Sequence, residues 1–225
     1  LGELDMAAPE GDLLAIHREL VARNEITEGL VYLQVTRGVA DRDFAYPKDT
    51  PSTLVMFTQA KGLIDSPAAQ TGIKVIAIDD LRWGRRDIKT VQLLYPSMGK
   101  MMAKAAGLDD AWMVEDGLVT EGTSNNAYIV KGGKIITRQL GNDILAGITR
   151  AAILKMAQEA QMVVEERAFS IAEAQAADEA FFTSASAFVM PVVEVDGATV
   201  GNGKPGPVTR RLREIYIDES RNVAI

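Results

Sequence analysis

Lys89 is the residue of this sequence whose surroundings first indicate chemistry. It lies between an apolar run at residues 75–78 and a second apolar stretch formed by Val91, Leu93 and Leu94. A lysine buried between such runs loses its proton easily, because burial disfavours the charged form. An unprotonated amine attacks carbonyl carbons and forms Schiff bases. The same pattern is also typical of a surface lysine between a strand and a helix, so both interpretations stay open at this point.

Three further segments could bind an anionic cofactor. Residues 147–149 (GIT) begin a predicted helix, where free backbone N–H groups and the positive end of the helix dipole favour a phosphate. Residues 183–186 (TSAS) end a predicted strand in small hydroxyl side chains, which can donate to phosphate oxygens. Glu121 could form an ion pair with a protonated ring nitrogen. Taken singly, these segments are equally compatible with a plain helix start, a polar turn and a solvated carboxylate.

The overall composition limits the classes of function that remain. The chain has 225 residues, of which 47% are hydrophobic and 24% are charged, as in ordinary globular enzymes. The net charge of -7 argues against a nucleic-acid or anionic-membrane surface, because either would require a basic patch. No run of residues is typical of a transmembrane span or a signal peptide, so we expect a cytoplasmic protein.

The rare residue types restrict the chemistry further. The chain has no cysteine, which excludes disulfides, thiolate metal sites and cysteine nucleophiles. Its single histidine, His17, lies in a periodic apolar segment at residues 12–24 and is expected to be an ordinary helix residue. A Ser-His-Asp triad or a multi-histidine metal site is therefore not expected. Lysine, arginine, tyrosine and acidic side chains, or a cofactor, must carry any chemistry.

Two predicted domains position these groups. Residues 1–62 form a small N-terminal domain, residues 63–72 have the glycine and proline content of a linker, and residues 73–225 form a large domain. The small domain is predicted to contain one helix (12–24) and two strands (30–36 and 52–59). The chain starts without an initiator methionine, so we expect further residues upstream of Leu1.

The large domain mixes strands and helices without a regular repeat. Its predicted strands are residues 73–78, 111–115, 126–130, 134–136, 162–166, 180–184 and 189–195. Its predicted helices are residues 96–106, 148–160, 170–177 and 207–216. This irregular order favours an α+β or pseudobarrel domain over a doubly wound sheet.

Three motifs, in their order and spacing, resemble the fold-type IV pyridoxal-phosphate enzymes. They are DIK at residues 87–89, TEGTSNN at 120–126 and GITR at 147–150. That group contains the D-amino-acid and branched-chain aminotransferases and aminodeoxychorismate lyase, and the resemblance extends over essentially the whole chain. It implies a two-domain α+β fold with a small α/β N-terminal domain and a larger pseudobarrel C-terminal domain. It also implies pyridoxal 5'-phosphate as cofactor and a homodimer.

The resemblance assigns expected roles to individual residues. Lys89 would form the Schiff base with the cofactor and then move the proton at the substrate Cα. Glu121 would pair with the pyridine nitrogen and keep it protonated, so that the ring can take up electrons. Leu145 would pack on the ring. The remaining expected cofactor contacts are the amides of Ile148 and Thr149, Ser184, the backbone of Ala185 (which replaces a frequent threonine), Ser124 and Asn125.

A second resemblance concerns substrate binding in the small domain. VTRG at residues 35–38, followed by Asp41 and Arg42, is most similar to D-amino-acid aminotransferases. Arg42 would bind the substrate carboxylate, a natural task for a planar and permanently charged group. Tyr32 would belong to the same site. Phe44 stands where those enzymes commonly carry a histidine, which weakens the carboxylate site and makes a more apolar pocket conceivable.

We therefore predict a ping-pong aminotransferase that converts a D-amino acid and a 2-oxo acid. The first alternative is a branched-chain L-amino-acid aminotransferase, with the same cofactor and the opposite substrate handedness. An (R)-amine transaminase and aminodeoxychorismate lyase are further alternatives. From a different class, the chain could be a catalytically silent relative or a binding module that keeps the fold.

Overall fold

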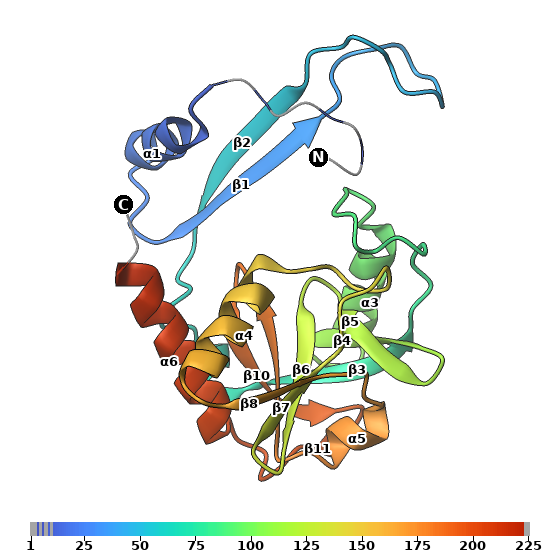
Figure 1. The fold of residues 1–225 in the computed structure, drawn as a ribbon, viewed down its shortest axis with the longest axis vertical. Coiled ribbons are helices and arrows are strands. Elements are labelled where there is room, and N and C mark those ends of the chain that lie inside the picture. Colours follow the sequence, from blue (N-terminus) through green and yellow to red (C-terminus); the bar gives the residue numbers. More distant parts are fainter. Residues whose placement is uncertain (1–3, 5, 7–8, 10, 223–225) are drawn as a thin grey trace. The chain divides into compact units, whose positions relative to one another are not determined.

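The computed structural model describes residues 4, 6, 9 and 11–222, and these divide into two compact units. The first unit is Leu1–Leu63 and the second is Ile64–Ile225 (Figure 1). None of the helices over the described residues is long and apolar enough to cross a membrane.

The small unit consists of one helix and a two-stranded antiparallel ribbon. Helix α1 (Leu13–Arg23) begins at Asp12, whose side chain accepts hydrogen bonds from two backbone N–H groups of the first turn, at 3.0 and 3.1 Å. Strands β1 (Gly29–Thr36) and β2 (Thr53–Ala60) pair along their whole length. The rings of Tyr32 and Phe57 stack across this pair with centroids 4.7 Å apart. The predicted helix and both strands are found.

The large unit is built on one mixed sheet. Its order is β5-β4-β3-β10-β9-β6-β7-β8, and β11 pairs with β10. The strands are β3 (Ile73–Asp79), β4 (Asp110–Glu115), β5 (Leu118–Gly122), β6 (Asn126–Lys131), β7 (Lys134–Thr137), β8 (Val163–Glu166), β9 (Glu179–Ser184), β10 (Phe188–Val195) and β11 (Ala198–Thr199). The helices are α2 (Pro67–Thr71), α3 (Leu94–Ala105), α4 (Ile148–Glu159), α5 (Ile171–Gln175) and α6 (Pro207–Asn222).

The sheet of the large unit is buried on both faces. Along β6, Tyr128 and Val130 belong to one apolar cluster, whereas Ala127 and Ile129 belong to another. Successive side chains of a strand point to opposite faces, so the continuous apolar run of β6 reflects cover on both sides. Helices α4 and α6 pack over β9 and β10 on the face of Tyr128 (Figure 1). Helix α3 packs against β3 and β4.

The structure adds elements that the sequence pattern did not predict. Strand β5 occupies Leu118–Gly122, a segment that is not among the predicted strands. The polar residues of β5 hide its strand pattern, and they are buried because they bond to other polar groups. Helix α2 lies within the segment with linker composition, the two-residue strand β11 was not expected, and α6 extends to Asn222 rather than residue 216. The mixed α+β composition that we expected is present.

Candidate functional site

Glu121 is the centre of a buried polar cluster in the large unit. It lies on β5 with only 6% of its side chain exposed. Its Oε1 accepts a hydrogen bond from Arg82 Nη1 at 2.7 Å. Its Oε2 accepts hydrogen bonds from Asn126 Nδ2 and from the Leu145 N–H, both at 3.1 Å. A carboxylate offers about four acceptor positions, so one position on Oε1 is left by these described partners.

Arg82 joins Glu121 to a second buried carboxylate, Asp80. The Nε and Nη2 atoms of Arg82 donate to the two oxygens of Asp80 at 2.9 and 2.7 Å. Thr120 Oγ1 donates to the same carboxylate at 2.6 Å, and the Asp80 side chain is 0% exposed. The planar guanidinium therefore binds one carboxylate with two atoms and keeps its third nitrogen for Glu121.

The two carboxylates respond differently to burial. Burial opposes the charge on Asp80, but the hydrogen bonds from Arg82 and Thr120 hold the pKa of Asp80 below its usual value. Burial raises the pKa of Glu121, against the opposing charge and hydrogen bond of Arg82 and the Leu145 N–H. Glu121 is thus a carboxylate with an open acceptor position and an increased affinity for protons. Such a group is suited to pair with a basic ring nitrogen.

The start of α4 has the properties of an anion site. Gly147 precedes the helix, so the backbone N–H groups of the first turn receive no capping bond from a side chain at that position. Thr149 is buried, and its Oγ1 finds no hydrogen-bond partner within the described chain. An unpaired buried hydroxyl beside free N–H groups and the positive end of a helix fits a phosphate.

The turn between β9 and β10 lies near this helix start. A Cβ on Gly147 would lie 2.4 Å from Asn126 Oδ1, so the two residues are in close contact. Asn126 is in turn the register partner of Thr183 on β9. Both predicted phosphate-binding segments therefore meet at Asn126. In the turn itself, Ser184 is half-buried and Ala185 is exposed.

Lys89 lies in the loop between β3 and α3, and its side chain is exposed. Of the two positions left open for this lysine, the structure shows the exposed one, and the flanking residues Val91 and Leu93 are also exposed. The loop is nevertheless anchored. Arg86 donates to both oxygens of Glu115, at 2.7 and 2.9 Å, and its N–H donates to the Asn142 carbonyl at 2.7 Å.

The remaining predicted cofactor residues have different environments. Leu145 is half-buried and bonds to Glu121 through its backbone, whereas Ile148 has a side chain that is 79% exposed. Ser124 is exposed. Asn125 is buried and donates to Asp110 at 2.9 Å, so its amide is engaged in the core of the large unit.

Arg82, Asp80 and Asn126 are the members of the cluster whose contacts the sequence did not indicate. Asn126 was visible only as the last residue of TEGTSNN, next to the equally polar Asn125. The strand predicted at residues 126–130 separated Asn126 from Asn125, but the strand pattern does not show which partner the amide of Asn126 meets. The short spacing between Asp80 and Arg82 was a possible signal for their mutual bond.

The predicted substrate residues lie in the small unit. Tyr32 donates its hydroxyl to Gln34 Oε1 at 2.8 Å, and its ring is part of the stack on Phe57. Arg42 and Phe44 are neighbours on an exposed loop, with the guanidinium carbon 5.4 Å from the ring centroid. Phe44 is 92% exposed.

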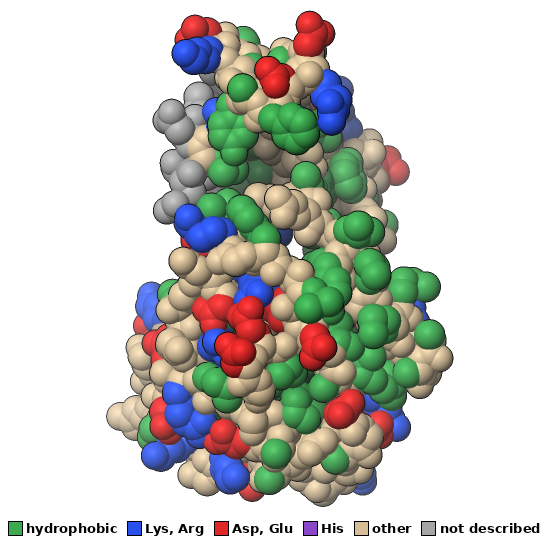
Figure 2. All heavy atoms as spheres, turned by 90° about the vertical axis from the view of Figure 1, so that its right-hand side faces the viewer, with side chains coloured by type: hydrophobic (Ala, Val, Ile, Leu, Met, Phe, Trp, Pro, Cys, Tyr) green, Lys and Arg blue, Asp and Glu red, His purple; other side chains and the backbone are tan. Residues whose placement is uncertain are grey.

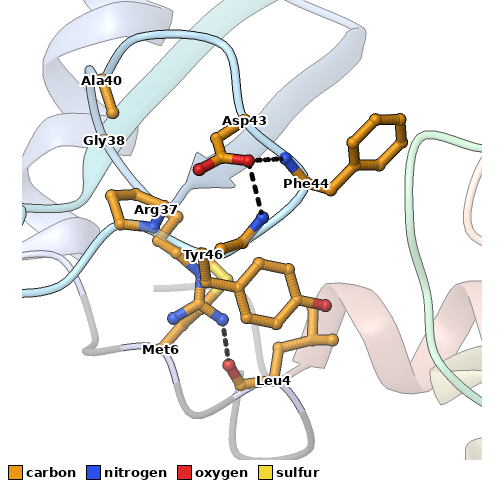
Figure 3. A pocket seen from close by; sticks show the side chains of 10 residues that line it. Leu4, Met6, Arg37, Gly38, Ala40, Asp43, Phe44 and Tyr46 are labelled. Carbon is orange, nitrogen blue, oxygen red and sulfur yellow. Dashed lines mark hydrogen bonds between the residues drawn. The ribbon is translucent and has the colours of Figure 1, made fainter.

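A cavity of about 360 Å³ lies beside this loop within the small unit. Its wall includes Arg37 and Tyr46, with the guanidinium carbon of Arg37 4.2 Å from the Tyr46 ring centroid, and Arg37 also donates to the carbonyl of Leu4 (Figure 3). Figure 3 shows the ring of Phe44 pointing away from Arg37 and Tyr46. Arg42 is not among the lining residues. The arginine that faces the cavity is thus Arg37.

Comparisons with known proteins bear on the whole chain. A model of the family described as amino-transferase class IV matches residues 1–195. A D-alanine aminotransferase of Bacillus licheniformis is 40% identical over 212 residues, which cover 93% of this chain and 74% of that protein. A D-alanine aminotransferase of Staphylococcus aureus (strain MSSA476) is 37% identical over 214 residues, with coverage of 94% and 75%.

Solved structures agree with this result at the level of the fold. A branched-chain amino acid aminotransferase from T.th., solved with pyridoxamine 5'-phosphate, matches with a TM-score of 0.85 and 26% identity. The match covers 96% of this chain and 74% of that one. The expected fold-type IV architecture is therefore confirmed.

Proposed function

Because the chain belongs to the amino-transferase class IV family, we propose that it transaminates D-amino acids with a 2-oxo acid as amino acceptor. The observation that carries the proposal is the buried Glu121 carboxylate, with its open acceptor position, in one cluster with the residues at the start of α4. The D-amino-acid specificity is supported by the relatives named D-alanine aminotransferase. The branched-chain L-amino-acid reaction is the first alternative, supported by the structurally similar enzymes.

Pyridoxal 5'-phosphate is the cofactor of this proposal, and the residues present fit it. Glu121 would hold the ring nitrogen through the open position on Oε1, and Leu145 would lie against the ring. The backbone N–H groups of Ile148 and Thr149, together with the unpaired Thr149 hydroxyl, would bind the phosphate. When bound, the cofactor supplies an aldehyde carbon and a ring that accepts electrons from the substrate Cα.

Three smaller assignments complete the cofactor site. Ser184 and the backbone of Ala185 would add phosphate donors from the turn after β9. Ser124 is exposed and free to contact the cofactor. Asn125 would act through the shape of the loop after β5, since its amide donates to Asp110.

Lys89 supplies the amine in this proposal. Its exposed side chain can reach a bound carbonyl carbon without first leaving a buried position. The unprotonated Lys89 amine would take the proton from the substrate Cα and would deliver it to the carbon that the cofactor's aldehyde supplies. The half-buried Arg82 and the buried Asp80 would keep Glu121 in place while the charge moves.

Substrate binding is assigned to the small unit. Arg42 makes no ion pair within the described part of the chain, so its guanidinium fork is available for a substrate carboxylate. Tyr32 is the second member of this site. Phe44 brings an aromatic ring to the position next to Arg42, which supports (R)-amines without a carboxylate as further substrates. Nothing in these residues favours the lyase reaction over transamination.

The experiment that tests the function uses the protein loaded with pyridoxal phosphate and follows the absorbance of its Lys89 adduct. D-alanine, L-leucine and an (R)-amine are added in turn without an acceptor. We expect D-alanine to bleach the band. Bleaching by L-leucine alone would support the branched-chain alternative. Bleaching by the amine alone would support the (R)-amine alternative, with Phe44 as part of an apolar substrate pocket. A protein that forms no adduct would be a binding module or a silent relative.

We also propose that the protein is a homodimer. Figure 2 looks onto the face that carries α3, where hydrophobic side chains gather. The exposed ones on and before this helix are Val91, Leu93, Leu94, Met98, Met101 and Met102, with exposures of 49 to 78%. Monomers rarely expose contiguous apolar patches of this kind, so a second copy is the expected cover. Light scattering of wild type and Met101→Asp tests this, and an equal, monomeric mass for both would contradict it.

The cytoplasmic location stays a prediction.

A further inference from the structure

The turn between β9 and β10 has an unusual residue in a strained conformation. Ser184 and Phe188 are register partners, so three residues form the loop, and the Ala187 N–H donates to the Ser184 carbonyl at 3.4 Å. Phe188 follows with a φ of 61°. Phe188 lies directly after this loop in the left-handed region, which is usually occupied by glycine because a side chain there meets the backbone. A bulky residue keeps such a conformation only when its surroundings enforce it.

Arg213 of α6 is the residue that enforces it. Its Nη1 donates to the carbonyls of Ala187 and Val189, at 2.7 and 3.0 Å, which are the carbonyls on either side of Phe188. Its Nη2 donates to the Ile64 carbonyl at 3.0 Å. Arg213 is only 9% exposed, so these bonds are made away from water. One side chain thus binds the backbone carbonyls of the two residues next to the strained residue.

The Phe188 ring also contacts α6, through two side chains. The guanidinium carbon of Arg213 lies 5.4 Å from the ring centroid. The Tyr216 ring, one turn later on α6, packs against Phe188 with centroids 5.4 Å apart. The aromatic ring, the arginine and the three carbonyls form one connected unit, which we call the Arg213 clamp. A planar arginine can make these bonds together, whereas the single ammonium of a lysine cannot.

The loop that the clamp holds is the one expected at the cofactor phosphate. At Ala185 this chain has no hydroxyl, so only a backbone N–H is available there. The direction of a backbone N–H is set by the backbone dihedrals of the turn, and a side-chain rotation cannot correct it. This loop therefore needs a fixed backbone more than a loop with a threonine at the same position would.

We propose that Arg213 and Phe188 are positioning residues that fix the backbone of the loop 184–187 for binding the cofactor phosphate. This inference rests on the proposed function, because it takes pyridoxal phosphate to be the ligand. Arg213 and Phe188 act through the loop and do not themselves contact the phosphate. Their effect should accordingly depend on whether the ligand carries a phosphate group.

The test measures the dissociation constants of pyridoxal phosphate and of pyridoxal, which lacks the phosphate, by absorbance titration. In Arg213→Met we expect the constant for pyridoxal phosphate to rise about tenfold and that for pyridoxal to change less than about twofold. Arg211→Met, on the same helix but with its side chain 62% exposed, is the matched control and should behave as wild type. An equal rise for both ligands in Arg213→Met would overturn the inference, because general loosening affects both.

A second variant separates the clamp from the stability of α6. Phe188→Gly removes the backbone strain at residue 188, because glycine adopts the left-handed conformation readily. Added to Arg213→Met, it should restore part of the lost affinity for pyridoxal phosphate. No recovery would contradict the role of the strained backbone. If Arg213→Met does not fold, Phe188→Ala replaces it, with the same phosphate-selective weakening expected and an unselective one overturning the inference.

The failure of this inference can be told apart from the failure of the proposed function. If the wild-type protein binds neither ligand, the proposed function is wrong and the inference falls with it. If the wild type binds pyridoxal phosphate and Arg213→Met binds it equally well, only the inference is wrong. Both readouts are binding constants and do not require the enzyme to turn over.

Discussion

The cluster around Glu121 and the loop around Arg42 are constructed in opposite ways. Glu121 and Asp80 are buried, Arg82 is half-buried, and hydrogen bonds of 2.7 to 2.9 Å join the three. Arg42 and Phe44 are exposed, and their described interaction is one contact between a guanidinium and a ring. Several hydrogen bonds thus fix each side chain of the first region, whereas few interactions hold the side chains of the second.

This difference separates two tasks of an aminotransferase. Cofactor chemistry requires charges held in one geometry, which buried and mutually bonded groups provide without reorganisation. Substrate selection can vary through a loop without disturbing the fold, since loops tolerate change. Substitutions in the cluster should consequently reduce stability and cofactor binding, and substitutions in the loop should alter substrate preference alone.

The largest effect is expected for Lys89, which combines an exposed position with the central chemical role. Lys89→Ala should lower the rate of the half-reaction with D-alanine by at least about 10³-fold, because both the nucleophile and the base are lost. The unfolding midpoint should stay unchanged, since the side chain is exposed. Lys155→Ala, on the exposed face of α4, is the control. Turnover retained in Lys89→Ala would refute the mechanism.

Arg82→Met should destabilise the protein most. It leaves Asp80 and Glu121 as buried carboxylates without their shared cation, which costs about 3–5 kcal/mol of unfolding free energy. Arg167 provides the comparison, because it also binds acidic residues but is 38% exposed, and Arg167→Met should cost about 1 kcal/mol or less. Urea denaturation measures both. Equal losses would show that burial does not distinguish the two networks.

The same variant should change the dependence of stability on pH. In the folded wild type the pKa of Asp80 is below its unfolded value. At pH values between the folded and the unfolded pKa, the unfolded chain therefore binds more protons than the folded protein. The contribution of Asp80 is therefore fully present above about pH 4 and is lost as the pH falls through the folded pKa. We expect this acid-side slope to be smaller in Arg82→Met. An identical slope would mean that Arg82 does not hold Asp80 ionised.

Arg42→Met should affect the substrate and leave the fold intact. Loss of a charged hydrogen-bond donor raises KM for D-alanine by about 10- to 100-fold, while KM for an (R)-amine stays constant because it has no carboxylate. Arg37→Met makes the test sharper, since Arg37 faces the cavity of the small unit. If KM for D-alanine rises in Arg37→Met and not in Arg42→Met, the substrate carboxylate binds at Arg37 in that cavity and not at Arg42 in the loop.

The smallest effect is expected for Phe44→His, which introduces the residue common at this position in D-amino-acid aminotransferases. An imidazole beside Arg42 can donate to a carboxylate, so the ratio of kcat/KM for D-alanine to that for an (R)-amine should rise about threefold to tenfold. The free energy of unfolding should not change, because Phe44 is almost fully exposed. A fall in the ratio would contradict the role assigned to the ring.

Part of the fold was predictable because its determinants are local. Helix α1 has a capping aspartate and apolar periodicity, and β6 and β9 each contain an uninterrupted apolar run, at residues 127–130 and 180–182. Strand β5 was not predictable, because the Thr120 and Glu121 side chains are polar. They are tolerated in a buried strand only through partners distant in sequence, such as Asp80 and Arg82.

By itself, the sequence determined the chemical inventory of this protein. It contains Lys89, the TEGTSNN motif at residues 120–126 and the GITR motif at residues 147–150 in the order and spacing of a cofactor family, and it has no cysteine. These are properties of residue type and order, which motifs record directly.

The tertiary structure alone decided which polar groups meet. It joined Arg82 to both Asp80 and Glu121, selected Asn126 rather than Asn125 as a partner of Glu121, and placed Arg213 across the strained Phe188. It also left Lys89 exposed despite its apolar neighbours. The physical reason is that burial and hydrogen-bond partners depend on contacts between segments far apart in the chain, which local pattern does not encode.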